Sequence, residues 1–388
     1  MFIIFLALFL LLHIYCCRRV WQAFEIFPKN RKLIITVIIF LGISYFPNVF
    51  LASIIPFTVS RFIAFFASTW IFIFLYLLLF LAFIDLVRLP NKYFNFLPKF
   101  IFLNYAKTKF ITMLTFILLI LPLSFLGIFS FTNPKITELD ITIDKRNAQH
   151  ENTIEFENTI EKTNAQKTLN IVAVSDLHLG YIINRARLKQ YVDLINAQNP
   201  DIVFFIGDII DISLETVVKQ KMDEELRRIK PKYGVYFVAG NHEHIRGDYE
   251  NMMRFFRSCG FIVLEDSTVL LNDEFYVVGR RDRFEKKRKR TYELTENLDK
   301  SKPIILLDHQ PYNLEHSVEA GVDLHLSGHT HNGQFFPINL IVKQVYELPY
   351  GYKKKDNTHF YVTSGLGVWG PPIRIATKSE LVRIRMRY

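Results

Sequence analysis

Cysteine is scarce in this sequence. Its 388 residues include Cys16, Cys17 and Cys259 and no other cysteine, which excludes a disulfide framework and a structural zinc site built from thiolates. Acidic residues are almost missing from residues 1–132, which hold 2 Asp/Glu against 11 Lys/Arg, while the remainder holds 35 against 36. The net charge of +10 therefore lies almost wholly in the first third and does not indicate a nucleic-acid-binding surface.

Charge is also missing from four long apolar stretches, which are residues 1–17, 33–60, 62–84 and 110–132. Each is close to or longer than the roughly 20 residues that cross a bilayer as a helix. The first lacks the basic start and the small-residue cleavage site of a signal peptide. These stretches predict an all-α transmembrane module at 1–132 with about four helices, in a cell (inner) membrane. Only Arg61 separates the second stretch from the third, and Pro47 and Pro56 leave a re-entrant second segment as an alternative.

Basic residues flank these stretches unevenly. Loops 18–32 and 85–109 each carry five Lys/Arg and one acidic residue, whereas Arg61 stands alone between the second and third stretches. The positive-inside rule then places both basic loops in the cytoplasm and residues 133–388 on the extracytoplasmic side. Within the second loop, Leu89–Leu103 interleaves aromatics with lysines, as an interfacial segment or an ordinary solvated loop does.

The pattern changes after residue 132. Residues 133–166 are a polar connector in which Ile136–Ile143 alternates like an edge strand, and from 167 to 388 short apolar runs alternate with helical segments. This is typical of an α/β domain whose strands are buried on both faces and whose ligands bind at the carboxyl ends of the strands. The expected strands are 169–174, 202–206, 235–238, 261–265, 274–279, 303–307 and 322–326, and the expected helices are 185–196, 214–229 and 249–257.

Five of these apolar runs end in side chains that bind metal ions. The endings are Ser-Asp-Leu-His-Leu-Gly at 175–180, Gly-Asp-Ile-Ile-Asp at 207–211, Ala-Gly-Asn-His-Glu at 239–243, Asp-His-Gln-Pro at 308–311 and Ser-Gly-His-Thr-His-Asn-Gly-Gln at 327–334. One such ending is an ordinary turn, but five indicate a site. Carboxylate, imidazole and amide ligands suit two divalent cations that share a bridging carboxylate. We expect Gly180, Gly207, Gly240 and Gly328 to let the backbone turn sharply beside them.

Taken in order, these motifs resemble the calcineurin-like metallophosphoesterase family over roughly residues 167–388. Gly328–Gln334, Tyr361–Gly367, Pro372-Ile373-Arg374 and Glu380 are similar to a membrane-anchored branch, with Asn332 where that branch has Gly. The resemblance implies a two-sheet β-sandwich flanked by helices, following the transmembrane module. It also implies hydrolysis of a phosphate ester with two divalent metal ions, Mn, Fe or Zn.

Carried over position by position, the resemblance assigns each ligand. The first metal takes Asp176, His178, Asp208 and His331, and the second takes Asp208, Asn241, His309 and His329. Asp208 bridges the two ions, and His242 contacts the phosphate and protonates the leaving group.

Other polar residues have plainer interpretations. Asp211 orients a ligand, His325 is a core or surface histidine, and Asp308 either steers His309 or ends a strand. We expect His13 at the membrane edge. The run Arg280–Arg290 has eight basic residues among eleven, and is either a solvated loop or a surface that recognises phosphate or an anionic headgroup.

The function expected is hydrolysis of a phosphodiester or pyrophosphate bond in a lipid-linked or nucleotide-linked substrate, with UDP-2,3-diacylglucosamine of lipid A synthesis as one candidate. The alternatives are a phosphomonoesterase acting on a soluble substrate and a membrane receptor or scaffold with a degenerate site. The complete set of ligands argues against a scaffold. The partners expected are the lipid bilayer and a phosphate-containing, amphiphilic substrate, and not a nucleic acid.

Overall fold

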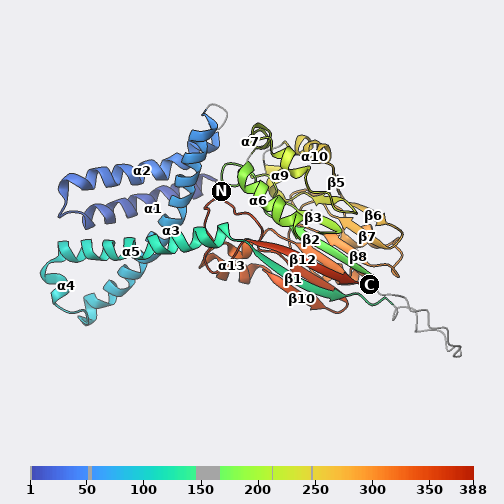
Figure 1. Ribbon diagram of the computed structural model, residues 1–388. Coiled ribbons are helices and arrows are strands. Elements are labelled where there is room, and N and C mark those ends of the chain that lie inside the picture. Colours follow the sequence, from blue (N-terminus) through green and yellow to red (C-terminus); the bar gives the residue numbers. More distant parts are fainter. Residues whose placement is uncertain (1, 51–54, 146–166, 212, 246–247) are drawn as a thin grey trace, which may run out of the picture. The chain divides into compact units, whose positions relative to one another are not determined.

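The chain folds into two compact units. The computed structural model describes residues 2–50, 55–145, 167–211, 213–245 and 248–388 (Figure 1). One unit, here the helical unit, comprises Met1–Phe129 with Gly370–Ile373, and the other, the sheet unit, comprises Ser130–Trp369 with Arg374–Tyr388. Most of the predicted connector, 146–166, lies outside the described residues.

The helical unit is built from apolar helices. Its helices are α1 (Phe2–Ala23), α2 (Pro28–Phe50), α3 (Phe57–Phe94), α4 (Phe100–Leu103) and α5 (Tyr105–Thr132). Within the part of the chain that the structure describes, α3 and α5 are long and apolar enough to cross a membrane. α2 is a continuous helix of 23 residues, about 34 Å long at 1.5 Å per residue. The count of four spans stays a prediction.

Two boundaries in this unit differ from the prediction. Arg61 does not separate the second and third spans, because α2 ends at Phe50 and α3 begins at Phe57 with Pro56 at its N-cap. A proline, which has no backbone N–H to contribute, suits a helix start. The predicted start of the second basic loop, at residue 85, is also wrong, because α3 continues to Phe94.

The two basic loops lie at the same end of the helical unit. Arg19, at the end of α1, forms an ion pair with Asp85 of α3 at 2.5 Å. Lys109 of α5 forms another with Glu25 at 2.5 Å. The pairs thus join residues 18–32 to residues 85–109, as expected if both basic loops face one side of a membrane.

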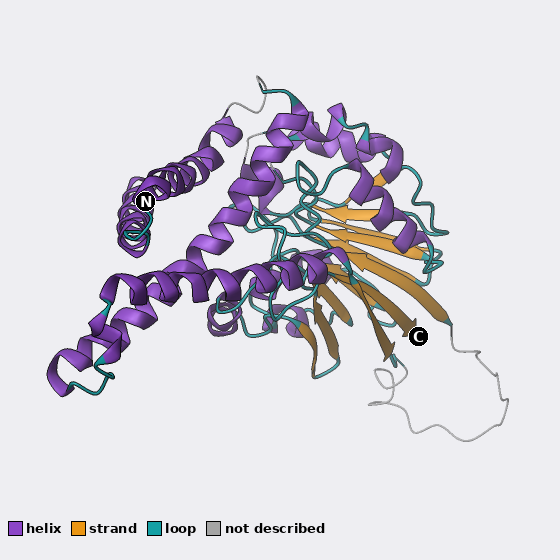
Figure 2. Ribbon diagram, turned by 60° about the vertical axis from the view of Figure 1, so that its left-hand side comes forward, coloured by secondary structure: helices purple, strands orange, loops and turns teal. Residues whose placement is uncertain are grey.

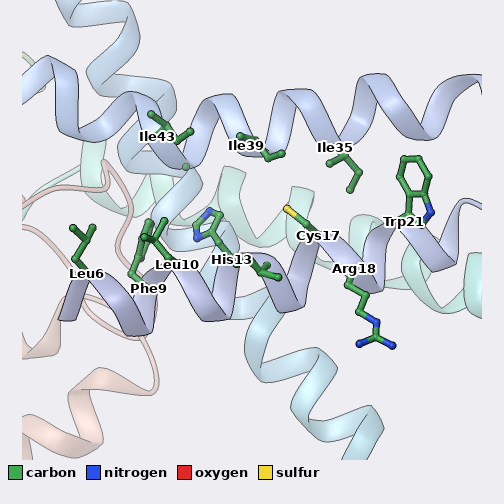
Figure 3. Close-up of a pocket in the computed structure, with 12 residues that line it drawn as sticks. Leu6, Phe9, Leu10, His13, Cys17, Arg18, Trp21, Ile35, Ile39 and Ile43 are labelled. Carbon is green, nitrogen blue, oxygen red and sulfur yellow. The ribbon is translucent and has the colours of Figure 1, made fainter. Parts of the chain in front are cut away.

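An apolar cavity of about 660 Å³ lies along α1 and α2 (Figure 3). His13 lines it. Only 8% of His13 is exposed, and its Nε2 accepts a hydrogen bond from the indole of Trp70 at 3.0 Å. Phe74 stacks on the imidazole with ring centroids 4.0 Å apart. The histidine is therefore a packed interior side chain of this unit.

The strands described in the sheet unit form two six-stranded sheets. The first has the order β1 (Lys135–Thr142), β12 (Glu380–Arg387), β2 (Thr168–Val174), β3 (Ile202–Ile206), β4 (Val235–Val238) and β5 (Phe261–Val263). The second has the order β10 (Gly351–Lys355), β11 (Thr358–Val362), β9 (Leu324–Ser327), β8 (Ile304–Leu307), β7 (Phe275–Gly279) and β6 (Ser267–Leu271). Strands β2 to β5 run parallel, as do β7, β8, β9 and β11.

Side-chain alternation along the strands sorts them into layers. Val203 and Phe205 of β3 pack outward, against helices such as α6 (Arg185–Asn196) and α10 (Tyr249–Ser258). Ile202 and Phe204 pack inward, in a core shared with β7, β8 and β9. Figure 2 shows the strands of this unit with helices outside them. The unit is thus a two-sheet sandwich flanked by helices, which confirms the expected fold class.

The predicted strands and α6 and α10 form close to their expected bounds, and β1 is an edge strand as expected. The helix expected at 214–229 is wrong as a single element. It breaks into α7 (Leu214–Lys219) and α8 (Met222–Leu226), because Lys221 has a left-handed φ of 53°. Strands β6, β10, β11 and β12 were not expected. The remaining elements are α9 (Asn241–Ile245), α11 (Thr291–Thr295), α12 (Glu315–Glu319), the 3₁₀ turn His331–Gly333 and α13 (Ile338–Val345).

Candidate metal centre

The predicted ligands follow the carboxyl ends of parallel strands. β2 leads to Asp176 and His178, β3 to Asp208, β4 to Asn241, β8 to His309, and β9 to His329 and His331. Five of these residues have left-handed φ values between 49° and 70°, namely Asp176, His178, Asp208, His329 and His331. Non-glycine residues seldom adopt this conformation, and such strain is typical of functional sites.

The side chains meet in three overlapping groups whose potential ligand atoms lie within 4.8 Å of one another. The groups are Asp176, His178 and His331; His178, Asp208 and His242; and Asp208, His309 and His329. The Nε2 atoms of His178 and His331 lie 3.1 Å apart. Oδ2 of Asp208 lies 3.2 Å from Nε2 of His309. Six of the seven predicted ligands thus form one continuous cluster, in which Asp208 stands at the centre.

Two buried ligand atoms have no hydrogen-bond partner among the described residues. Nδ1 of His309 lies 2.7 Å from the carbonyl of Ile206, which can only accept a hydrogen bond, so Nδ1 carries a proton. Nε2 of His309 faces the cluster, where Oδ2 of Asp208 at 3.2 Å is its neighbour, and no hydrogen bond of good geometry engages it among the described residues. Oδ1 of Asn241, the seventh predicted ligand, is also buried and unpartnered. Orphaned acceptors beside carboxylates fit divalent cations.

The charges of the cluster also suit cations. Burial raises the pKa of Asp176, and the neighbouring Asp208 contributes to the rise. Burial opposes ionisation of Asp208 too, but His309 holds the pKa of that carboxyl well below its usual range. Although burial opposes it, Asp208 raises the pKa of His309 well above its usual value, so a cation bound there would displace a proton. Burial lowers the pKa of His329 to about 3 and that of His331 well below its usual value.

Glu243 holds the loops together, and sequence reasoning gave it no role. Its buried carboxylate accepts four backbone hydrogen bonds, from Gly240 at 2.7 Å, Asp208 at 3.0 Å, Ile209 at 2.8 Å and Ile210 at 3.0 Å. It therefore fixes the loop after β3 to the loop after β4. The sequence did offer a hint, because Glu243 closely follows an apolar strand, and a buried acidic side chain needs hydrogen-bond partners.

His242 is held in place by two hydrogen bonds. Its backbone N–H donates to Oδ1 of Asp208 at 2.8 Å. Its Nδ1 donates to the carbonyl of Asp211 at 3.0 Å, which directs Nε2 away from that contact. Oδ1 of Asp211 also lies 3.5 Å from Nδ1 of His178. Asp211 thus contacts both imidazoles, consistent with the orienting role expected of it.

Close packing explains three of the four expected glycines. A Cβ atom at Gly240 would lie 2.3 Å from Oδ1 of Asp208, and one at Gly328 would lie 2.4 Å from Oδ2 of Asp176. Gly207 has a φ of 76°, and its Cβ would meet His309. Gly180 was wrongly included, because a Cβ there makes only ordinary contacts, the nearest at 3.6 Å.

A buried arginine supports the last ligand. Only 1% of Arg374 is exposed, and its Nη2 donates to the carbonyls of Ser364 at 2.6 Å and Gly367 at 2.8 Å. Its Nη1 donates to the carbonyl of His331 at 3.3 Å. Arg374 therefore positions the turn that carries His331.

Two further predicted residues, His325 and Asp308, take definite places. His325 is a core histidine, with Ser317 at 2.9 Å from Nδ1 and Ser327 at 3.1 Å from Nε2, and burial lowers its pKa to about 4. Asp308 does more than end a strand, since it is fully buried and forms ion pairs with Arg280 at 2.7 Å and Arg288 at 3.1 Å. The basic run is thus not simply a solvated loop.

Comparisons with known proteins identify the family of the chain. The family model of calcineurin-like phosphoesterases matches residues 169–333. An uncharacterised metallophosphoesterase of Aquifex aeolicus is 30% identical over 234 residues, which cover 58% of this chain and 88% of that protein. The chain belongs to the calcineurin-like phosphoesterase family.

Two other relatives extend the comparison. An uncharacterised metallophosphoesterase of Helicobacter pylori is 33% identical over 65% of this chain and 64% of its own length. A protein of Danio rerio described as a transmembrane protein with metallophosphoesterase domain is 30% identical over 62% of this chain and 58% of its own length. The chain thus spans less than two thirds of the length of these two relatives. As a calcineurin-like phosphoesterase, it combines the family's fold with apolar helices that indicate membrane association.

Proposed function

We propose that this calcineurin-like phosphoesterase hydrolyses phosphodiester or pyrophosphate bonds with two divalent cations. The observation that carries the proposal is that Asp208 is the carboxylate shared by two ligand groups, one with His178 and His242 and one with His309 and His329. Asp176, His178, Asp208 and His331 would hold one cation, while Asp208, Asn241, His309 and His329 would hold the other. Mn, Fe and Zn all suit such nitrogen and oxygen ligands.

The bound cations supply Lewis-acid stabilisation of the charge that develops on the phosphoryl oxygens. The protein's own residues do the remaining work. Glu243 and Arg374 keep the ligand loops in place, as their bonds to backbone groups indicate. His242, with Nδ1 engaged by the carbonyl of Asp211, presents Nε2 for protonation of the leaving oxygen.

The substrate proposed is amphiphilic. The apolar helices associate the chain with a membrane, where a tethered enzyme meets a membrane-bound substrate at a raised effective concentration. The segment Leu89–Leu103 exposes large aromatics, including Tyr93, Phe94 and Phe100 at 70% or more, which suits an interfacial position. UDP-2,3-diacylglucosamine is one candidate of this chemistry.

The orientation proposed follows the charge of the helical unit. Both basic loops lie at one end, joined by the pairs Arg19–Asp85 and Glu25–Lys109. With that end in the cytoplasm, an even number of spans places the sheet unit on the extracytoplasmic side of the inner membrane.

Two substitutions test the hydrolytic proposal. Asp208→Asn removes the shared carboxylate, so we expect elemental analysis to show loss of bound metal together with loss of phosphodiesterase activity. His242→Ala leaves the proposed ligands intact, so we expect metal to be retained while kcat falls about 10²–10⁴-fold. A fully active Asp208→Asn enzyme would refute the two-cation centre.

A further inference from the structure

The basic loop Arg280–Arg290 is a folded structure beside the proposed metal centre. Nη1 of Arg280 lies 2.7 Å from Oδ2 of Asp308, and Nη1 of Arg288 lies 3.1 Å from Oδ1 of the same carboxylate. Asp308 is fully buried and directly precedes the proposed ligand His309. The two arginines therefore anchor both ends of the loop to the strand that carries His309, and neither is free to bind a ligand.

Two aspartates fix the backbone of the loop between these anchors. Asp282 is fully buried and accepts hydrogen bonds from the amide of Gln310 at 2.8 Å and from the N–H of Phe284 at 2.8 Å. Asp266 accepts from the N–H groups of Arg281 and Lys289, each at 2.9 Å. The backbone on either side of residue 283 is therefore held in place.

Arg283 lies between these fixed points and is exposed. Its guanidinium carbon lies 3.8 Å from the ring centroid of Tyr312. The Tyr312 hydroxyl donates to that of Tyr346 at 3.1 Å, and the Tyr346 ring centroid lies 6.1 Å from that of His329. A continuous row of side chains thus connects Arg283 to a proposed metal ligand. Among the residues that the structure describes, no carboxylate forms an ion pair with Arg283.

A guanidinium stacked on an aromatic face keeps the N–H groups at its edge available, and this planar edge matches two phosphate oxygens. Stacking also reduces the side-chain entropy lost on binding. We propose that Arg283, supported by Tyr312 and Tyr346, binds a second phosphate group of the substrate, beyond the phosphorus that is attacked. The inference rests on the proposed function and assigns the substrate to the class of pyrophosphate-containing molecules.

The test compares two inhibitors of the metal-loaded, full-length protein in detergent micelles. Bis(p-nitrophenyl) phosphate serves as the reporter substrate, and the inhibitors are inorganic phosphate and imidodiphosphate, a non-hydrolysable analogue of pyrophosphate. For Arg283→Ala we expect the ratio of the two inhibition constants to shift by about tenfold or more against imidodiphosphate, as loss of a charge-assisted hydrogen bond implies. Arg283→Lys keeps the charge without the planar edge, so we expect a smaller shift.

Lys287→Ala is the matched control, because Lys287 is an exposed cation of the same loop with no ion pair among the described residues. Its inhibition ratio should equal that of the wild type, which also controls for chelation of the metal by imidodiphosphate. Equal ratios for Arg283→Ala and Lys287→Ala would overturn the inference. If the wild type hydrolyses no phosphate ester at all, the proposed function fails, and calorimetric titration of both variants with imidodiphosphate then decides the Arg283 subsite on its own.

Discussion

Replacing Glu243 with glutamine changes one atom of the carboxylate that joins two loops of the proposed centre. Oε1 of Glu243 accepts from Ile209 and Ile210, and Oε2 accepts from Asp208 and Gly240. An amide supplies only one acceptor oxygen, so two buried N–H groups would face an NH₂ group. Each unsatisfied donor costs about 1–3 kcal/mol, or roughly 2–6 kcal/mol for both.

Part of this loss of folding stability is offset. Burial raises the pKa of Glu243, with Asp208 contributing, which means that the ionised carboxylate is itself costly in this position. A neutral amide removes that cost, so we expect the free energy of unfolding to fall by about 2–3 kcal/mol. For a unit of this size the melting temperature should fall by about 4–12 °C. Because the backbone of Asp208 loses its support, metal affinity should fall about 10–100-fold.

Thermal unfolding of the metal-free protein in detergent, followed by tryptophan fluorescence, measures the first effect, and calorimetric titration with Mn²⁺ measures the second. Glu250→Gln is the matched control, since Glu250 is an exposed acid of α10. An unchanged melting temperature and Mn²⁺ affinity in Glu243→Gln would show that the four backbone bonds do not hold the loops.

Three further outcomes are expected. Burial lowers the pKa of His325 from 6.5 to about 4, so its contribution to stability is complete above pH 6.5 and is lost as the pH falls towards 4, by about 3 kcal/mol in all. The melting temperature of metal-free His325→Gln should therefore depend less on pH between 7 and 4.5 than that of the wild type. An equal pH dependence would contradict this. A reporter fused at residue 140 should be active only outside the cytoplasm, and a cytoplasmic signal would reverse the proposed orientation. A diacyl substrate in micelles should show a higher kcat/KM than its water-soluble headgroup analogue, because acyl-chain binding energy reaches the transition state, and equal values would rule out an amphiphilic substrate.

Most residues of the proposed centre could be predicted from the sequence, because metal ligands follow the ends of strands. Continuous apolar runs mark strands buried on both faces, and parallel strands bring their carboxyl ends to one edge. That reasoning placed Asp176 and His331 in one cluster although 155 positions separate them in the chain. It missed β12, whose alternation of apolar and charged residues from Glu380 to Arg387 was a readable signal.

The roles of Glu243 and Arg374 depend on what surrounds them, since the same residues on a surface would be unremarkable charges. The sequence alone also left the run Arg280–Arg290 with two opposing interpretations. The tertiary structure separated its members, because Asp308 neutralises Arg280 and Arg288 while Arg283 stacks on Tyr312.

The sequence by itself determined the order of the two units, the apolar helices and the set of residues able to bind metal. These features depend on local composition and on the spacing of apolar residues along the chain. Only the tertiary structure decided which charges are paired, which atoms the histidine nitrogens face and where His13 and His325 lie. Those properties depend on contacts between residues far apart in the chain, where burial removes water and each polar atom must find a partner nearby.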